Sequence, residues 1–105
     1  MDNKHNIKIL VEQLTTSDLT SRRNAAHKLF SLAIHGEDLF DIYQVLFACL
    51  DDEDSQVKVT ILKLFFHLKE NKKQINLPVK KISDLLNDPS DEVKKEANLL
   101  LKLSA

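Results

Sequence analysis

Hydrophobic residues recur at spacings of three and four in three short stretches of the chain. The matched positions are Ile7, Leu10 and Leu14, then Tyr43, Leu46 and Leu50, then Val79, Ile82 and Leu86. Such spacings place residues on one face of an α-helix. We therefore predict helices at about 3–15, 37–50 and 78–87. Asn76 and Pro78 suit the start of the third, because proline is tolerated in a first helical turn.

A second amphipathic pattern follows each of these stretches. It begins after Asp18, Asp54 or Ser90, which are good N-cap residues. Gly36 is a plausible left-handed C-cap for the first of these helices, and Asn71 for the second. The positions 7, 11, 15 and 18 residues after Leu14, Leu50 and Leu86 lie together on this pattern. We expect them to face the preceding helix and form the core.

The segments around these helix starts resemble one another at a fixed spacing of 36 residues. They read LTTSDLTSRRNAAHKLFSL from Leu14, LDDEDSQVKVTILKLFFHL from Leu50 and LNDPSDEVKKEANLLLKLS from Leu86. A period of this size is typical of stacked repeats, in which no unit buries its apolar face alone. We expect one all-α domain over residues 1–105, built from three antiparallel helix pairs at about 1–36, 37–72 and 73–105.

The turns LDDEDSQVK and LNDPSDEVK, with the helices after them, resemble the HEAT repeat. The first copy departs from the family by having Ser21 where valine is preferred, and the period is shorter than usual for the family. The resemblance implies an α-solenoid whose second helices line a concave, protein-binding surface. It also implies a ladder of turn aspartates and following cations between units. The matching residues are Asp18, Asp54, Arg22, Lys58 and Lys94, with Ser90 in place of the third aspartate.

Composition and motifs exclude several classes of function. The chain is 43% hydrophobic and 30% charged with a net charge of -1, which gives no overall attraction to nucleic acid or to an anionic membrane. No stretch approaches a membrane span or a signal peptide, so we expect a cytoplasmic protein. Cys49 lies in an apolar run, which favours a buried, inert thiol.

No catalytic, cofactor or metal motif is apparent. The four histidines are scattered, and none is followed by the glutamate that HEAT-like iron enzymes use. The acidic run 51–54 lacks the glycine and the final glutamate of a calcium loop, which favours a solvated helix start. We therefore expect no enzyme activity, no cofactor and no metal.

The positions 9, 13 and 16 residues after each repeat leucine fall on the side of the second helices away from the core. They form the candidate protein-binding surface: Arg23, His27, Phe30, Val59, Lys63, Phe66, Lys95, Leu99 and Lys102. Phe30 and Phe66 are equivalent positions, and aromatic side chains beside cations are typical of binding hot spots. The alternative is that both rings tuck between repeats and belong to the core.

The last helix of the sequence is rich in leucine, and we expect no polar capping helix after it. It carries Leu99, Leu100, Leu101 and Leu103. Either three of the four pack inward, or some of them meet a partner or a second copy in a homodimer.

These observations favour a small protein-binding module, such as an adaptor or an immunity-type inhibitor, that grips an acidic partner on its concave face. Two alternatives stay open. One is nucleic-acid binding along a basic concave face, against which the interleaved acids and the net charge of -1 weigh. The other is an accessory subunit resembling the phycobilin lyases with HEAT-like folds.

Overall fold

The computed structural model describes residues 3–104, and every regular element in that range is helical. The long helices are α1 (Asn3–Leu14), α2 (Leu19–Ile34), α4 (Ser55–Glu70) and α6 (Asp91–Ser104). Two short helices, α3 (Tyr43–Ala48) and α5 (Val79–Asp84), are lengthened by 3-10 turns. These turns are η1 (Phe40–Ile42) and η2 (Cys49–Asp51) on either side of α3, and η3 (Leu85–Asn87) after α5. The all-α prediction is confirmed; residues 1, 2 and 105 lie outside the described range.

The predicted starts of the three second helices are confirmed, and their cause is local. The Asp18 carboxylate accepts a hydrogen bond from the Ser21 amide at 3.1 Å. Asp54 accepts in the same way from the Val57 amide, at 3.0 Å. A cap of this kind satisfies an amide that has no partner inside the helix.

The helix ends confirm one prediction and correct another. Gly36 has φ +88 and closes α2 in the left-handed conformation, as expected. Asn71 does not adopt this conformation: its φ is -90, and the left-handed residue after α4 is Lys72, with φ +58. Asn71 instead uses its side-chain amide, which donates to the His67 carbonyl at 2.8 Å. The exposed turn therefore carries a lysine where its equivalent 36 residues earlier carries glycine.

The helix expected to begin at residue 37 begins three residues later. The Asp38 carboxylate accepts a hydrogen bond from the Phe40 amide at 2.9 Å, so a side-chain turn takes the place of the first helical turn. In the third stretch Pro78 is the N-cap and the helix begins at Val79. The predicted start at about residue 78 is therefore confirmed within one residue, and Asn76 lies two residues before the N-cap.

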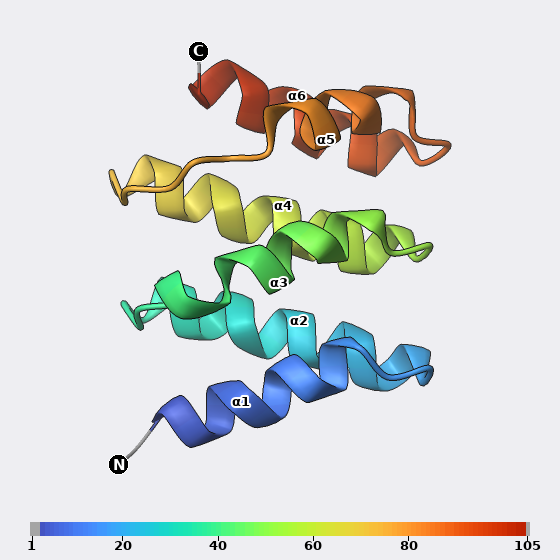
Figure 1. Ribbon diagram of the computed structural model, residues 1–105. Helices are drawn as coiled ribbons and strands as arrows, with labels where there is room; N and C mark the ends of the chain where they lie inside the picture. The colour runs from blue at the N-terminus through green and yellow to red at the C-terminus, as the bar shows by residue number, and fades with distance from the viewer. Residues whose placement is uncertain (1–2, 105) are drawn as a thin grey trace.

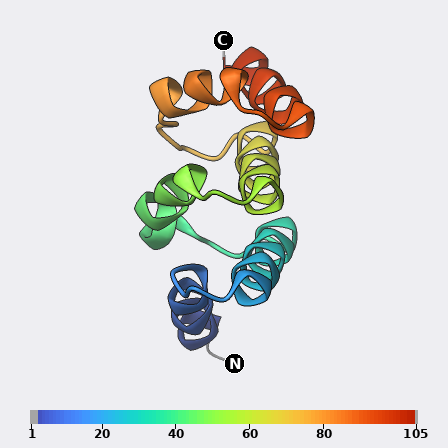
Figure 2. The ribbon, with the colours of Figure 1, turned by 90° about the vertical axis from the view of Figure 1, so that its right-hand side faces the viewer.

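Successive helices run in opposite directions and form two layers (Figures 1 and 2). In Figure 2, α2, α4 and α6 form one column, which we call the second-helix layer. The helices α1, α3 and α5 form the other column, the first-helix layer. Within the second-helix layer α4 packs against both α2 and α6. The molecule measures 39 × 32 × 18 Å, so it is about two helices thick.

The core lies between the two layers, where the sequence pattern places it. Among the predicted core positions the following are buried: Ala25, Leu29, Val57, Ile61, Phe65, Leu68, Val93 and Ala97. The prediction is wrong for the exposed Ser104, and Ser21, Leu32 and Leu101 are only partly buried. The central helix α4 is buried on most of its circumference, and its residues 57–62 form an unbroken buried run. This follows from its position, because α4 has a neighbouring helix on either side as well as the first-helix layer beside it.

At two positions the outer helices of the second-helix layer are polar where the middle helix is apolar. Leu62 and Leu64 of α4 are fully buried, whereas the equivalent of Leu62 on α6 is the exposed Asn98 and the equivalent of Leu64 on α2 is the exposed Lys28. A polar residue at a position that is apolar in the middle of a stack keeps the outer face soluble. The last helix therefore carries its own polar face. Leu100 is fully buried and Leu101 packs against the core, while Leu99 and Leu103 are exposed. The prediction that three of these four leucines pack inward is therefore wrong.

Candidate functional site

Cations of one segment pair with carboxylates of the next along the second-helix layer. Arg22 donates to Asp52 at 2.9 Å. Thirty-six residues later, Lys58 pairs with Asp88 in the same way. The side chains of Lys58 and Asp88 are only 11% and 7% exposed, so this pair is shielded from solvent. These repeated ion pairs link α2 to the turn before α4, and α4 to the turn before α6.

Two cations of the predicted ladder, Arg22 and Lys58, do form ion pairs between repeats. Their partners are Asp52 and Asp88 and not the predicted Asp18 and Asp54. Asp18 caps its own helix, and its pKa is lowered by hydrogen bonds from the Ser21 side chain and amide. Lys94 pairs only locally, with Asp91 at 3.2 Å. The carboxylates that meet Arg22 and Lys58 are two residues before the N-caps. This earlier position matters because each also accepts from the amide two residues on, which holds the turn closed.

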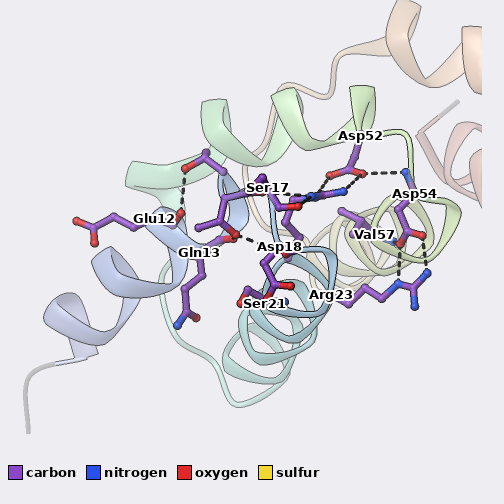
Figure 3. A network of polar contacts seen from close by, with 12 residues as sticks. Glu12, Gln13, Ser17, Asp18, Ser21, Arg23, Asp52, Asp54 and Val57 are labelled. Atoms are coloured by element: carbon purple, nitrogen blue, oxygen red, sulfur yellow. Dashed lines mark hydrogen bonds and ion pairs between the residues drawn. The ribbon is translucent and has the colours of Figure 1, made fainter.

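Arg23 belongs to this contact network as well. Its guanidinium donates to both oxygens of Asp54, at 3.0 and 2.7 Å, and Figure 3 shows the two side chains meeting between α2 and α4. This hydrogen bond lowers the pKa of Asp54, and the Val57 amide adds to the effect. The same contact raises the pKa of Arg23. Arg23 was predicted for the binding surface, and the structure places it in a bidentate contact between segments.

Four of the predicted surface residues converge on one hollow of the second-helix layer. This hollow has a volume of ≈ 300 Å³ and is lined by His27, Phe30, Gln56, Val59, Thr60, Lys63 and Glu92. We call it the second-helix hollow. His27 and Lys63 are exposed at its rim, while Val59 is only 6% exposed and lies in its floor. The hollow therefore combines an apolar floor with charged edges.

Phe30 and Phe66 are partly buried and pack against the core. Phe30 also lines the second-helix hollow beside residues of α4. Neither ring belongs to the strongly exposed apolar residues of the described chain. Both rings therefore contribute to packing, which favours the alternative in which they belong to the core.

The remaining predicted residues lie on α6. Lys95, Leu99 and Lys102 are exposed, and Leu99 is 38% accessible. They do not line the second-helix hollow. Leu103, one helical turn after Leu99, is 39% accessible. The two leucines form a small apolar pair at the end of the second-helix layer.

Three residues that line the hollow were not predicted from the sequence: Gln56, Thr60 and Glu92. Gln56 and Glu92 are equivalent positions, six residues after the repeat leucines, so the period did contain a signal. Thr60 could not be predicted in this way. Its hydroxyl donates a hydrogen bond to the Gln56 carbonyl of the same helix, at 2.9 Å, and nothing in the sequence shows that it faces a hollow. Only packing brings these residues beside His27 and Lys63.

The chemistry of the described residues is limited. Burial raises the pKa of the Cys49 thiol to about 11, and the charge of Asp52 adds to this, so little thiolate forms near neutral pH. No group of three potential metal ligands occurs within residues 3–104. None of the helices in that range combines the length and the apolar character needed to cross a membrane.

Comparison with protein-family models finds no match for this chain, and comparison with curated proteins finds none either.

Proposed function

We propose that this chain is a HEAT-like α-solenoid that works as a non-catalytic protein-binding module. Three observations support the proposed architecture. The sequence repeats every 36 residues. The ion pairs Arg22–Asp52 and Lys58–Asp88 repeat at the same interval. Both ends of the second-helix layer carry polar residues where the middle is apolar, as end units of a repeat stack require.

The binding surface in this proposal is the second-helix layer, the concave side of the solenoid. The observation that carries it is the second-helix hollow, where His27, Phe30, Val59 and Lys63 meet. An apolar floor with polar groups at the rim is the usual composition of a pocket that receives one anchoring side chain. A volume of ≈ 300 Å³ is large enough to receive a single side chain.

The partner in this proposal presents an acidic group beside an apolar anchor. Among residues 3–104, Lys63 has no salt-bridge partner, so its ammonium is available at the rim. Arg23 contributes less than the sequence pattern indicates, because Asp54 already neutralises it. Lys95 and Lys102, exposed on α6, extend the positive edge and would steer association with an acidic surface.

Affinity capture from cells that make the protein, read by quantitative mass spectrometry, tests this function. The bait is the wild-type chain, the Lys63→Glu variant, or the Lys80→Glu variant. Lys80 is exposed on α5 in the other layer, so its substitution makes the same charge change away from the proposed surface. Both substitutions should change the free energy of unfolding by no more than about 0.5 kcal/mol.

The proposal expects a protein that is retained by the wild type and by Lys80→Glu, and lost with Lys63→Glu. Retention by all three baits would refute the second-helix layer as the binding surface. Loss with Lys80→Glu alone would place binding on the opposite layer.

A further inference from the structure

Two grooves on the first-helix layer are related by the repeat period. The α1 groove lies between α1 and residues 37–42 and has a volume of ≈ 740 Å³. The α3 groove lies between α3 and residues 74–76 and has a volume of ≈ 570 Å³. Six lining positions correspond at a spacing of 36: Lys4 and Phe40, Ile7 and Tyr43, Lys8 and Gln44, Val11 and Phe47, Asp38 and Gln74, Leu39 and Ile75. The α1 groove is therefore an internal reference for the α3 groove.

The two grooves differ in chemistry although their positions correspond. The α1 groove has charged residues at its edges, including Lys8 and Asp38. The equivalent residues of the α3 groove are the amides Gln44 and Gln74. Asp41 is the only charged residue among those that line the α3 groove. The fold accepts charges at these positions, so packing alone does not require their replacement.

The α3 groove is also lined by a chain of aromatic rings that leads from the surface to the core. Phe40 meets Tyr43 edge-on, with ring centroids 5.6 Å apart, and Tyr43 lies 6.4 Å from Phe47. Phe47 in turn packs on Phe65, at 5.4 Å. Phe40 is 65% exposed, more than any other large apolar residue of the described chain. An exposed ring that contacts partly buried rings is a rigid anchor for a ligand, because little side-chain freedom is lost when it binds.

The polar groups of the α3 groove match an extended peptide. Gln44, Gln74 and Asn76 are exposed amides, and each offers both a donor and an acceptor to a peptide backbone. Asp38, whose charge adds to the effect of burial in raising the pKa of Tyr43, lines the α1 groove and not this one. Lys73 precedes Gln74 in the chain but lines a different hollow. Among the residues that line the α3 groove, Asp41 therefore sets the charge.

We propose that the α3 groove binds an extended, proline-containing segment of a partner protein, with one basic residue that meets Asp41. Aromatic-lined grooves favour the polyproline II conformation, because it is already ordered and leaves its carbonyls free. This site lies on the layer opposite the second-helix hollow. The protein would then bind two partner surfaces, one on each layer.

A nuclear magnetic resonance titration of the ¹⁵N-labelled chain tests this proposal. The probes are short proline–alanine peptides that carry a single arginine at successive positions, added up to about 1 mM. We expect saturable shifts of the amides of residues 40–47 and 74–76 with at least one peptide. Replacement of its arginine by glutamate should weaken binding about tenfold, because Asp41 then repels the peptide.

Two variants make the test specific. Phe40→Lys introduces the residue type of Lys4, its equivalent in the α1 groove, at an exposed position. It should weaken peptide binding about 30-fold. Ile34→Lys is the matched control: Ile34 is 52% exposed at the end of α2, and its replacement should leave the affinity unchanged.

Three results would overturn the proposal. The first is the absence of shifts with every peptide. The second is a set of shifts confined to the second-helix hollow, which would leave the proposed function standing without this site. The third is a set of shifts around Phe40 that follows protein concentration alone, which would mean that a second copy occupies the groove.

Discussion

The ion pair between Lys58 and Asp88 gives the sharpest test of how the segments are held together. Burial by itself would raise the pKa of Asp88, but the hydrogen bond from Lys58 and the one from the Ser90 amide outweigh it, so the pKa is lowered. The Asp88→Asn substitution removes the charge and keeps an oxygen that accepts from Ser90. It therefore leaves the capped turn in place and isolates the charge on Lys58.

The expected magnitude follows from the burial of the pair. Breaking a buried ion pair by removing one partner costs about 3–5 kcal/mol, because the other charge stays buried without compensation. The Lys58 and Asp88 side chains are slightly exposed, and the flexible lysine can turn towards water. We therefore expect Asp88→Asn to lower the free energy of unfolding by about 3 kcal/mol. In a domain of this size this corresponds to a fall in melting temperature of roughly 12–24 °C.

Urea denaturation followed by circular dichroism measures this change, and the chain provides a matched control. Asp51 pairs with Lys81 at 2.6 Å, but these side chains are 69% and 40% exposed. Asp51→Asn should cost only about 0–1 kcal/mol, since water screens such a pair. The cycle of Lys58→Met, Asp88→Asn and the double variant should give a coupling energy of about 2 kcal/mol.

Equal losses of unfolding free energy for Asp88→Asn and Asp51→Asn would refute the special role of the buried pair. A coupling energy below about 0.5 kcal/mol would also refute it, because the two side chains would then act independently. In either case the repeated ion pairs would not be what fixes α4 against the turn before α6.

Three further predictions concern the turn after α4, acid stability and the two tucked rings. Lys72→Gly should raise the free energy of unfolding by about 1 kcal/mol, because glycine adopts φ +58 without strain, and Gly36→Ala should lower it by a similar amount. Both are measurable by urea denaturation. The lowered pKa of Asp54 contributes stability that is present above its ordinary value of 3.8 and lost as the pH falls through its folded value. Wild type should therefore lose more stability than Asp54→Asn between about pH 5 and pH 2, and equal losses would contradict this. Phe66→Ala should cost about 2 kcal/mol, since the ring packs on the core; an unchanged melting temperature would restore the exposed reading.

Local signals account for what could be predicted correctly. The N-cap residues, the left-handed Gly36 and the spacing of apolar residues each act within a few positions of the chain, so they can be read without knowing what lies across the fold. They determined the starts of the second helices and most of the core. The cause that delays the start of the third helix along the chain to Phe40 is also local. The Asp38 side chain accepts a hydrogen bond from the Phe40 amide, and this turn outweighs the hydrophobic period.

The candidate site depended on contacts between residues about 30 positions apart. Arg23 and His27 lie one helical turn apart, and both were predicted for the binding surface. Asp54 neutralises Arg23, whereas His27 remains exposed at the hollow. The exposure of Phe30 and Phe40 also depended on the tertiary structure. The ring expected at the surface is tucked against the core, and one that carried no prediction is 65% exposed.

The sequence by itself determined that this chain is helical, where its second helices begin and which of their faces is apolar. Only the tertiary structure decided which carboxylate meets each cation, which rings are covered and where the grooves lie. The physical reason is that a helical period specifies direction around one helix axis. The distance and offset between neighbouring helices come from the packing of whole side chains across the layers, and the polar partners follow from that packing.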